Sequence, residues 1–259
     1  MTTLIREDPG DGIVLLRFNR PDRLNALDEV LVDEFLRACA SITAERDVRV
    51  VILTGAGRGF CSGMDVRDFG PSNLEATDPA IDRLRFQEMM ASLPLALRNL
   101  PQPVIAAVNG PAVGGGLALC LASDVRICAA SASFANAAIQ LGLTGAEMGM
   151  SYYLPRVVGL TAAADWMLTG RTVSAGEALE RGLVSELVDD GRLLHRALEL
   201  ASSIATHAPL AVQMTKRALQ VNTDAPDLVA AMELENRNQV ITHATEEAAA
   251  ARRRWTSKK

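Results

Sequence analysis

The sequence PVIAAVNGPAVGGGLALCLASD, residues 103–124, is the longest apolar run of the chain and the strongest indicator of its fold. It predicts a strand at 104–108, a turn at 109–111 and a short helix at 117–122. The glycine triplet 114–116 lies between turn and helix. A helix that begins on glycines presents unpaired backbone N–H groups and the positive end of its dipole to a negatively charged oxygen. The triplet also fits a simple packing turn, so taken alone it leaves both interpretations open.

The length of this run raises the question of a membrane span. Pro103, Asn109, Pro111 and the glycine triplet interrupt the run, and no basic loops flank it. A bilayer-spanning helix needs about 20 uninterrupted apolar residues. We therefore expect a buried strand, turn and helix, and no membrane span.

The composition indicates a globular protein with a large core, because 49% of the 259 residues are hydrophobic and 22% are charged. The net charge of −5 argues against nucleic-acid partners, which need a basic surface. The acidic N-terminal residues show no signal peptide, so we expect a cytoplasmic protein. The cysteines lack paired spacing and are expected to be reduced and buried, and the histidines show no metal-ligand pattern; these residues are Cys39, Cys61, Cys120, Cys128, His195, His207 and His243.

The rest of the chain alternates strands and helices, which predicts an α/β fold of stacked β-β-α units with mostly parallel pairing. Strands are expected at 13–18, 48–55 and 125–130, and helices at 29–44, capped by Asp28, at 82–99 and from Ser174 to Gly182. The glycine-rich loop after residue 55 matches neither nucleotide-binding fingerprint.

Residues 67–80 are predicted to form a surface loop, and the chain from 192 onward is predicted to be helical, over 192–206, 209–221 and 226–253. We divide the chain into a core, 1–195, and a C-terminal helical region, 196–259. Such helices either cover the core or pair with another subunit, and the sequence does not choose between these arrangements.

Five stretches resemble the enoyl-CoA hydratase/isomerase, or crotonase, family, in order and spacing from residue 13 to about 220. They are NRPDRLNALD, VVILTGAGRGFCSGMDV, PVIAAVNGPAVGGGLALCLASDVRIC, LTGRTVSAGEALERGLVSELV and APLAVQMTKRAL. The resemblance implies a crotonase-like spiral of β-β-α units with a C-terminal helical region for trimerisation. It also implies a homotrimer or a dimer of trimers, an acyl-CoA thioester as ligand, and no metal or redox cofactor.

By this resemblance, the thioester carbonyl lies between the backbone N–H groups of Met64 and Gly115. Fixed donors of this kind stabilise an enolate by about 3–4 kcal/mol each. The positions where the family surrounds CoA and the acyl chain are Arg23, Ala26, Ser62, Gly63, Asp65, Val66, Val113, Gly116, Ala138 and Leu141. Arg23 also fits a solvated turn residue, although a guanidinium group suits phosphate.

The sequence departs from the family's hydratases at both glutamates that handle water, because Ala118 and Ala138 stand there. Glu147 is the leading candidate for a general acid or base, and Asp68 is a weaker second candidate. Thr144 and Glu147 also fit a capping box, which would make Glu147 a helix cap. Asp124 is expected to have a structural role. We therefore predict a lyase or isomerase acting on acyl-CoA, and the alternative is a catalytically silent acyl-CoA carrier or sensor.

Overall fold

The computed structural model describes residues 2–67, 69 and 78–257. A six-stranded sheet forms its centre, and all neighbouring strands pair in parallel except the first two, which pair antiparallel. In spatial order these strands are β1 (Leu4–Gly10), β2 (Ile13–Phe18), β3 (Val50–Gly55), β4 (Val104–Val108), β6 (Val125–Ala129) and β9 (Glu186–Val188). The predicted α/β class with mostly parallel pairing is confirmed.

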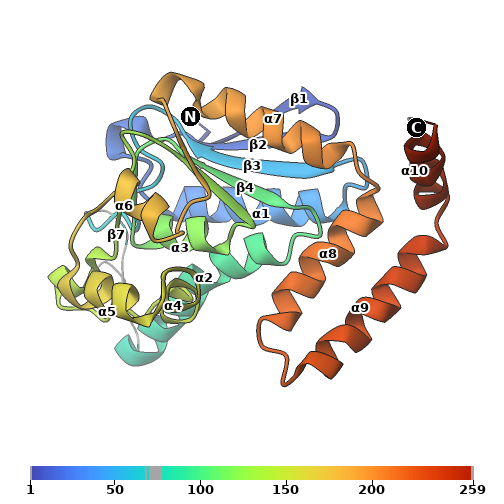
Figure 1. Cartoon of the computed structure of the whole chain (residues 1–259). Coiled ribbons are helices and arrows are strands. Elements are labelled where there is room, and N and C mark those ends of the chain that lie inside the picture. Colours follow the sequence, from blue (N-terminus) through green and yellow to red (C-terminus); the bar gives the residue numbers. More distant parts are fainter. Residues whose placement is uncertain (1, 68, 70–77, 258–259) are drawn as a thin grey trace.

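Helices cover both faces of this sheet (Figure 1). α1 (Glu29–Ala44), α2 (Pro79–Arg98) and α3 (Gly115–Ala122) lie on one face, and α7 (Leu193–Ala205) lies on the other. Alternate residues of one strand enter different cores: Leu16 packs in the larger cluster and Leu15 in the smaller cluster with Leu193 and Ala197. Because both faces are covered, the central strands are apolar along their whole length, as in other parallel sheets.

A smaller sheet extends the fold toward the glycine triplet. It contains β5 (Pro111–Val113), β7 (Ser133–Ala135) and β8 (Val173–Ser174). Isolated parallel bridges join Leu27 to Met64 and Cys61 to Ala112, and so tie the segment after β3 to this second layer. The remaining elements of this part are η1 (Pro21–Arg23), η3 (Ala137–Leu141), α4 (Met150–Val158), α5 (Leu160–Thr169), α6 (Ala175–Glu180) and η4 (Asp190–Arg192).

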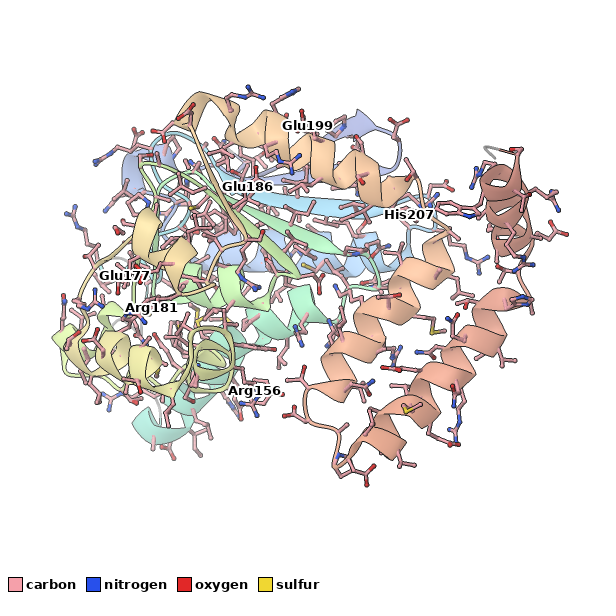
Figure 2. All side chains as sticks on the ribbon, in the orientation of Figure 1. Arg156, Glu177, Arg181, Glu186, Glu199 and His207 are labelled. Carbon is pink, nitrogen blue, oxygen red and sulfur yellow. The ribbon has the colours of Figure 1, made fainter. Side chains whose placement is uncertain are left out.

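The C-terminal helices α8 (Pro209–Asn222), α9 (Leu228–His243) and α10 (Glu246–Thr256) project from the body of the protein (Figure 1). Figure 2 shows Arg156 on the side of the body that faces α8 and α9, and its guanidinium lies 3.0 Å from a carboxylate oxygen of Asp224. None of the helices in the described ranges has the length and apolar character that crossing a bilayer requires.

The predicted elements are largely confirmed, and the main differences concern an edge strand, a turn and the C-terminal helices. The sequence did not predict β1, whose pattern LIREDPG is polar and mostly outside the core, as suits the edge of a sheet. The single helix expected over 226–253 is divided, because Thr245 accepts a hydrogen bond from the Ala248 N–H and so starts a new helix. The turn expected at 109–111 ends earlier than predicted, because Pro111 already belongs to β5. Most of the predicted loop at 67–80 lies outside the described residues.

The thiols of all four cysteines are free and buried, as predicted. Asp124 has the expected structural role: its Oδ2 accepts a hydrogen bond from the Val104 N–H at 2.8 Å and lies 2.8 Å from the Lys216 Nζ. In the described parts of the chain, no cluster of His, Cys, Asp and Glu side chains could hold a metal ion.

Candidate active site

Two chain segments meet at the N-terminus of α3 with almost no space between them. A Cβ added to Gly116 would lie 2.0 Å from the Cys61 carbonyl oxygen, so only glycine fits there. Gly63 has φ +86°, and a Cβ added to it would lie 2.8 Å from the Val113 carbonyl oxygen and 3.4 Å from the Gly115 nitrogen. Residues 61–64 therefore lie directly against the first turn of α3, which brings Met64 close to Gly115, the other donor that the family resemblance implies.

The hydrogen bonds around Met64 are made by the residues on either side of it. The Leu27 N–H donates to the Gly63 carbonyl at 2.7 Å, and the Asp65 N–H donates to the Leu27 carbonyl at 2.9 Å. Gly115 is the first residue of α3, where an N–H has no acceptor inside the helix. Across the described residues, neither the Met64 N–H nor the Gly115 N–H donates to a protein acceptor. Both donors are therefore available to an oxygen atom of a ligand.

The carboxyl group of Glu147 lies beside this pair of donors. Its Oε1 is 4.0 Å from the position that a Cβ on Gly114 would occupy, one residue before Gly115. Burial raises the pKa of Glu147, and a side-chain hydrogen bond with Gln87 of α2 opposes part of that rise. A carboxyl group whose pKa is raised exchanges protons more readily near neutral pH.

The turn that follows Glu147 aims this carboxyl group toward α3. Met148 has φ 47° and Gly149 has φ 81°, so two consecutive residues adopt the left-handed conformation before α4 begins at Met150. Met148 is buried, and its Sδ lies 3.3 Å from the Cβ position of Gly115. A left-handed methionine is energetically costly, and such strain gathers at functional sites.

The capping-box interpretation of Thr144 and Glu147 does not match the observed helix start. The N-cap of α4 is Gly149, and the Thr144 hydroxyl accepts a hydrogen bond from the Ala146 N–H at 3.1 Å. The Glu147 carboxyl group thus lies away from the helix start that it was expected to cap, and faces the Gly114 turn.

The two alanines at the hydratase positions are both buried. Ala118 lies in α3, three residues after Gly115, and Ala138 lies in η3. Neither side chain can transfer a proton. Asp68, the second acid candidate, lies outside the described residues.

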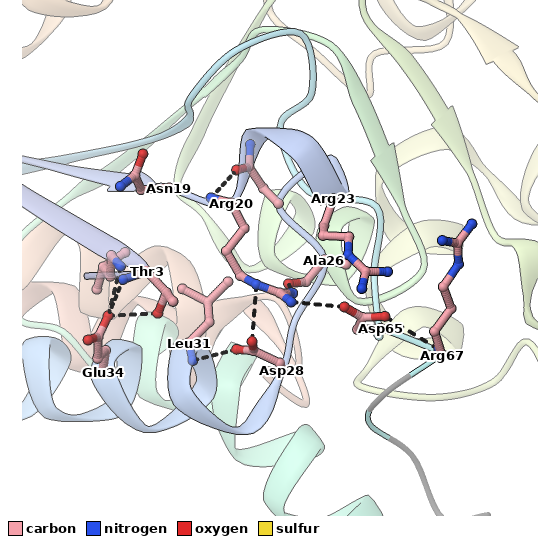
Figure 3. Close-up of polar contacts among 12 residues, drawn as sticks. Thr3, Asn19, Arg20, Arg23, Ala26, Asp28, Leu31, Glu34, Asp65 and Arg67 are labelled. Atoms are coloured by element: carbon pink, nitrogen blue, oxygen red, sulfur yellow. Dashed lines mark hydrogen bonds and ion pairs between the residues drawn. The ribbon is translucent and has the colours of Figure 1, made fainter. Parts of the chain in front are cut away.

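The predicted ligand-contacting residues fall into exposed and enclosed groups. Arg23, Val66 and Leu141 are exposed, whereas Ala26 and Asp65 are buried. The Ser62 hydroxyl lies 3.4 Å from the Arg23 carbonyl oxygen, and the Val113 N–H donates to the Cys61 carbonyl at 2.9 Å. The Asp65 carboxylate is held by Arg20, with 3.0 Å between Oδ2 and the guanidinium nitrogen (Figure 3).

Sequence reasoning missed two polar residues of this site, Arg20 and Gln87. The stretch NRPDRLNALD contains Arg20 and Arg23, and no pattern in it shows which side chain turns inward. Gln87 lies within a long helix and carries no motif, so only the packing of α2 beside Glu147 could reveal it.

A parallel α/β scaffold that brings two backbone N–H groups and a carboxyl group into one region has the donors needed to stabilise a developing oxyanion. The pattern of the family described as "Enoyl-CoA hydratase/isomerase" matches residues 8–259. A Mycobacterium leprae protein named "Probable enoyl-CoA hydratase" is 43% identical over 252 residues, which cover 95% of this chain and 86% of that protein. The Escherichia coli protein "1,2-epoxyphenylacetyl-CoA isomerase" is 37% identical over 209 residues, or 80% of this chain and 78% of that one.

Solved structures agree with these relatives. A crystal structure of an enoyl-CoA hydratase from Bacillus anthracis superposes with a TM-score of 0.92 at 32% identity, covering 99% of this chain and 97% of the other. The chain belongs to the enoyl-CoA hydratase/isomerase family, and its fold is the crotonase fold.

Proposed function

We propose that the protein is an acyl-CoA isomerase that moves a carbon–carbon double bond in an enoyl-CoA thioester. The thioester carbonyl oxygen accepts hydrogen bonds from the Met64 and Gly115 N–H groups. Glu147 removes a proton from C2 of a 3-enoyl thioester, and the negative charge moves to the carbonyl oxygen between the two donors. The same carboxyl group returns the proton at C4, which leaves the double bond between C2 and C3. The proton is only relocated, so no water or co-reactant is consumed.

The observation that carries this proposal is the position of Glu147 beside the Gly114–Gly115 turn, 4.0 Å from the Gly114 Cβ position. Hydration needs acid and base groups that activate and deliver water, and Ala118 and Ala138 occupy the positions where the family's hydratases carry them. Moving a proton within one substrate needs a single carboxyl group. The relatives named as hydratases therefore support the acyl-CoA substrate class more strongly than they support hydration.

The direct test is incubation of the protein with 2-enoyl-CoA and 3-enoyl-CoA thioesters of several chain lengths, followed by chromatography with mass detection. We expect a product of unchanged mass and shifted retention, because isomerisation adds no atoms. A product heavier by one water would replace isomerisation with hydration. Saturable acyl-CoA binding with no product would make the protein a carrier or sensor and would overturn the proposed isomerase activity.

Glu147→Gln tests the assigned base, and Glu180→Gln, at an exposed position of α6, is the matched control. We expect Glu147→Gln to lower turnover by about 10²–10⁴-fold, the usual effect of losing a general acid or base.

The melting temperature of Glu147→Gln should be higher than that of the parent at pH 7 and equal at low pH. The pKa of Glu147 is raised in the folded protein, so its ionised form disfavours folding as pH rises through that pKa, and glutamine has no such form. Full activity in Glu147→Gln would contradict the assignment.

We also propose that the protein assembles as a homotrimer or a dimer of trimers through its C-terminal helices. Exposed apolar side chains on α8, α9 and α10 support this: Leu219, Leu228, Val229, Val240 and Trp255 are each 69–74% exposed. An apolar surface of this kind is typical of an interaction site. The buried thiols fit a reducing, cytoplasmic location.

A further inference from the structure

The guanidinium group of Arg20 contacts oxygen atoms from three places in the chain (Figure 3). It donates to the Ala26 carbonyl, its Nε lies 3.0 Å from Asp28 Oδ2, and another of its nitrogens lies 3.0 Å from Asp65 Oδ2. Only 15% of the Arg20 side chain and 4% of the Asp65 side chain are exposed. A planar fork of five donors is suited to joining several acceptors in this way.

These three contacts surround the backbone that carries Met64. Ala26 comes directly before Leu27, and Asp65 comes directly after Met64. Leu27 and Met64 are bridge partners, held by the Leu27 to Gly63 and Asp65 to Leu27 hydrogen bonds. Arg20 therefore binds both strands of this bridge: the Ala26 carbonyl on the strand of Leu27, and the Asp65 carboxylate on the strand of Met64.

The other contacts of Arg20 link it to α1 and to the buried side chain of Asn25. Asp28 caps α1 by accepting a hydrogen bond from the Leu31 N–H at 2.8 Å. The Arg20 guanidinium, which contacts Asp28, is therefore linked to the start of this 16-residue helix. The Arg20 N–H donates to Asn25 Oδ1 at 2.8 Å, and Asn25, which is completely buried, donates to the Gly59 carbonyl at 2.7 Å. Both the backbone and the side chain of Arg20 are therefore fixed by hydrogen bonds.

Arg20 and Asp65 carry opposite charges, and this pairing lowers the pKa of Asp65. Burial by itself would raise the pKa of Asp65, but the hydrogen bond from Arg20 and the positive charges of Arg20 and Arg23 outweigh it and lower that pKa. Asp65 therefore stays ionised at neutral pH, and its ion pair with Arg20 is maintained. The Asp65 side chain is buried, whereas the next residue, Val66, is exposed.

We propose that Arg20 is a positioning residue that sets the direction of the Met64 N–H in the oxyanion hole, acting through Asp65 and the Ala26 carbonyl. This inference rests on the proposed function. An oxyanion-hole donor is effective only when it points at the place where charge develops. A misplacement of about 1 Å lowers the rate by roughly 10²-fold. Arg20 thus acts on the rate of the chemical step, whereas binding of the CoA part does not depend on it.

The test compares Arg20→Met, Arg20→Lys and Asp65→Asn with the parent. We expect Arg20→Met to lower kcat by roughly 10²-fold with little change in KM, because the lost interaction acts in the transition state. Arg20→Lys should recover part of this loss, since it keeps the charge but not the fork. Asp65→Asn should also lower kcat. A rise in KM with kcat unchanged would instead make Asp65 a ligand for CoA and overturn the inference.

Arg6→Met is the matched control, because Arg6 also joins two carboxylates, Glu45 at 2.7 Å and Asp8 at 3.1 Å, away from the site. It should leave kcat unchanged. A kcat loss in Arg6→Met equal to that in Arg20→Met would show a general stability effect and overturn the inference. If Arg20→Met does not fold, Asp65→Asn and Arg20→Lys decide the outcome.

Binding of acetoacetyl-CoA separates this inference from the proposed function, because a bound enolate of this thioester is detected by its ultraviolet absorbance without turnover. The parent should bind it as the enolate, and Arg20→Met should bind it mainly as the ketone. A parent that binds no acyl-CoA thioester would remove the proposed function. A parent that forms the enolate and an Arg20→Met variant that forms it equally well would remove only the role of Arg20.

Discussion

The segments around Gly115 and the C-terminal helices are built in opposite ways. Around Gly115 the backbone segments touch so closely that side chains cannot fit: a Cβ on Gly116 would lie 2.0 Å from the Cys61 carbonyl oxygen, and one on Gly110 would lie 2.1 Å from the Arg58 carbonyl oxygen. Between α8 and α9, by contrast, there is a groove of about 680 Å³. A second cavity of about 670 Å³ lies between α8, α9, α10 and the start of strands β4 and β6, at Pro103 and Val125.

This difference shows which features depend on one chain and which depend on neighbours. The Met64 and Gly115 N–H groups are positioned by contacts that the chain makes with itself, so the proposed oxyanion hole lies within a single chain. The C-terminal helices have large exposed apolar side chains and no core of their own, so their full burial requires another surface. Substitutions in the two regions should therefore have effects of different size and kind.

Gly116→Ala should have the largest effect on stability. The new methyl group would meet the Cys61 carbonyl oxygen at 2.0 Å, and neither backbone can move without disturbing β5 or α3. We expect the free energy of unfolding to fall by at least about 3 kcal/mol, measured by urea unfolding. Gly191→Ala is the control, because no atom lies within 4 Å of its Cβ position, and it should stay within about 0.5 kcal/mol of the parent. Equal stabilities of the two variants would disprove the close contact.

The close approach of backbone segments at the site was predictable from the sequence, because it depends on glycines rather than on particular side chains. A strand, a turn of asparagine, glycine and proline, and a helix that begins on glycines can be recognised at 103–124 without knowing any partner. The two donors are backbone groups, so their positions follow from the motifs whatever the side chain at Met64.

The side-chain network was not predictable in this way. Arg20 meets Asp65, which lies 45 positions further along the chain, and Gln87 of α2 meets Glu147 in the segment before α4. Such contacts depend on the packing of distant segments, and local patterns do not encode it. The edge strand β1 was missed for a related reason, since its polar residues carry no apolar alternation.

Lys216→Met should have the next largest effect, because Lys216 anchors α8 to the body. Only 6% of its side chain is exposed, and its Nζ lies 2.8 Å from both the Gln102 carbonyl oxygen and Asp124 Oδ2. The substitution would leave a carboxylate and a carbonyl without this donor, and breaking such a buried pair costs about 3 kcal/mol. Arg217→Met, at the exposed neighbouring position, should change the free energy of unfolding by less than about 0.5 kcal/mol. A Lys216→Met variant as stable as Arg217→Met would mean that α8 is held by its apolar contacts alone.

The double substitution Val229→Asp and Val240→Asp should have the smallest effect on the chain itself and a large effect on assembly. Both side chains are more than 70% exposed on α9, so each change should alter the stability of a single chain by less than about 0.5 kcal/mol. If this face packs against another copy, two buried carboxylates would prevent that contact. Light scattering should then give the mass of a trimer or hexamer for the parent and of a monomer for the variant. Arg237→Asp introduces the same total change of charge, two units, at an exposed polar position of the same helix and should keep the mass of the parent. A monomeric parent, or a double variant that assembles as the parent does, would show that these helices do not join copies of the chain.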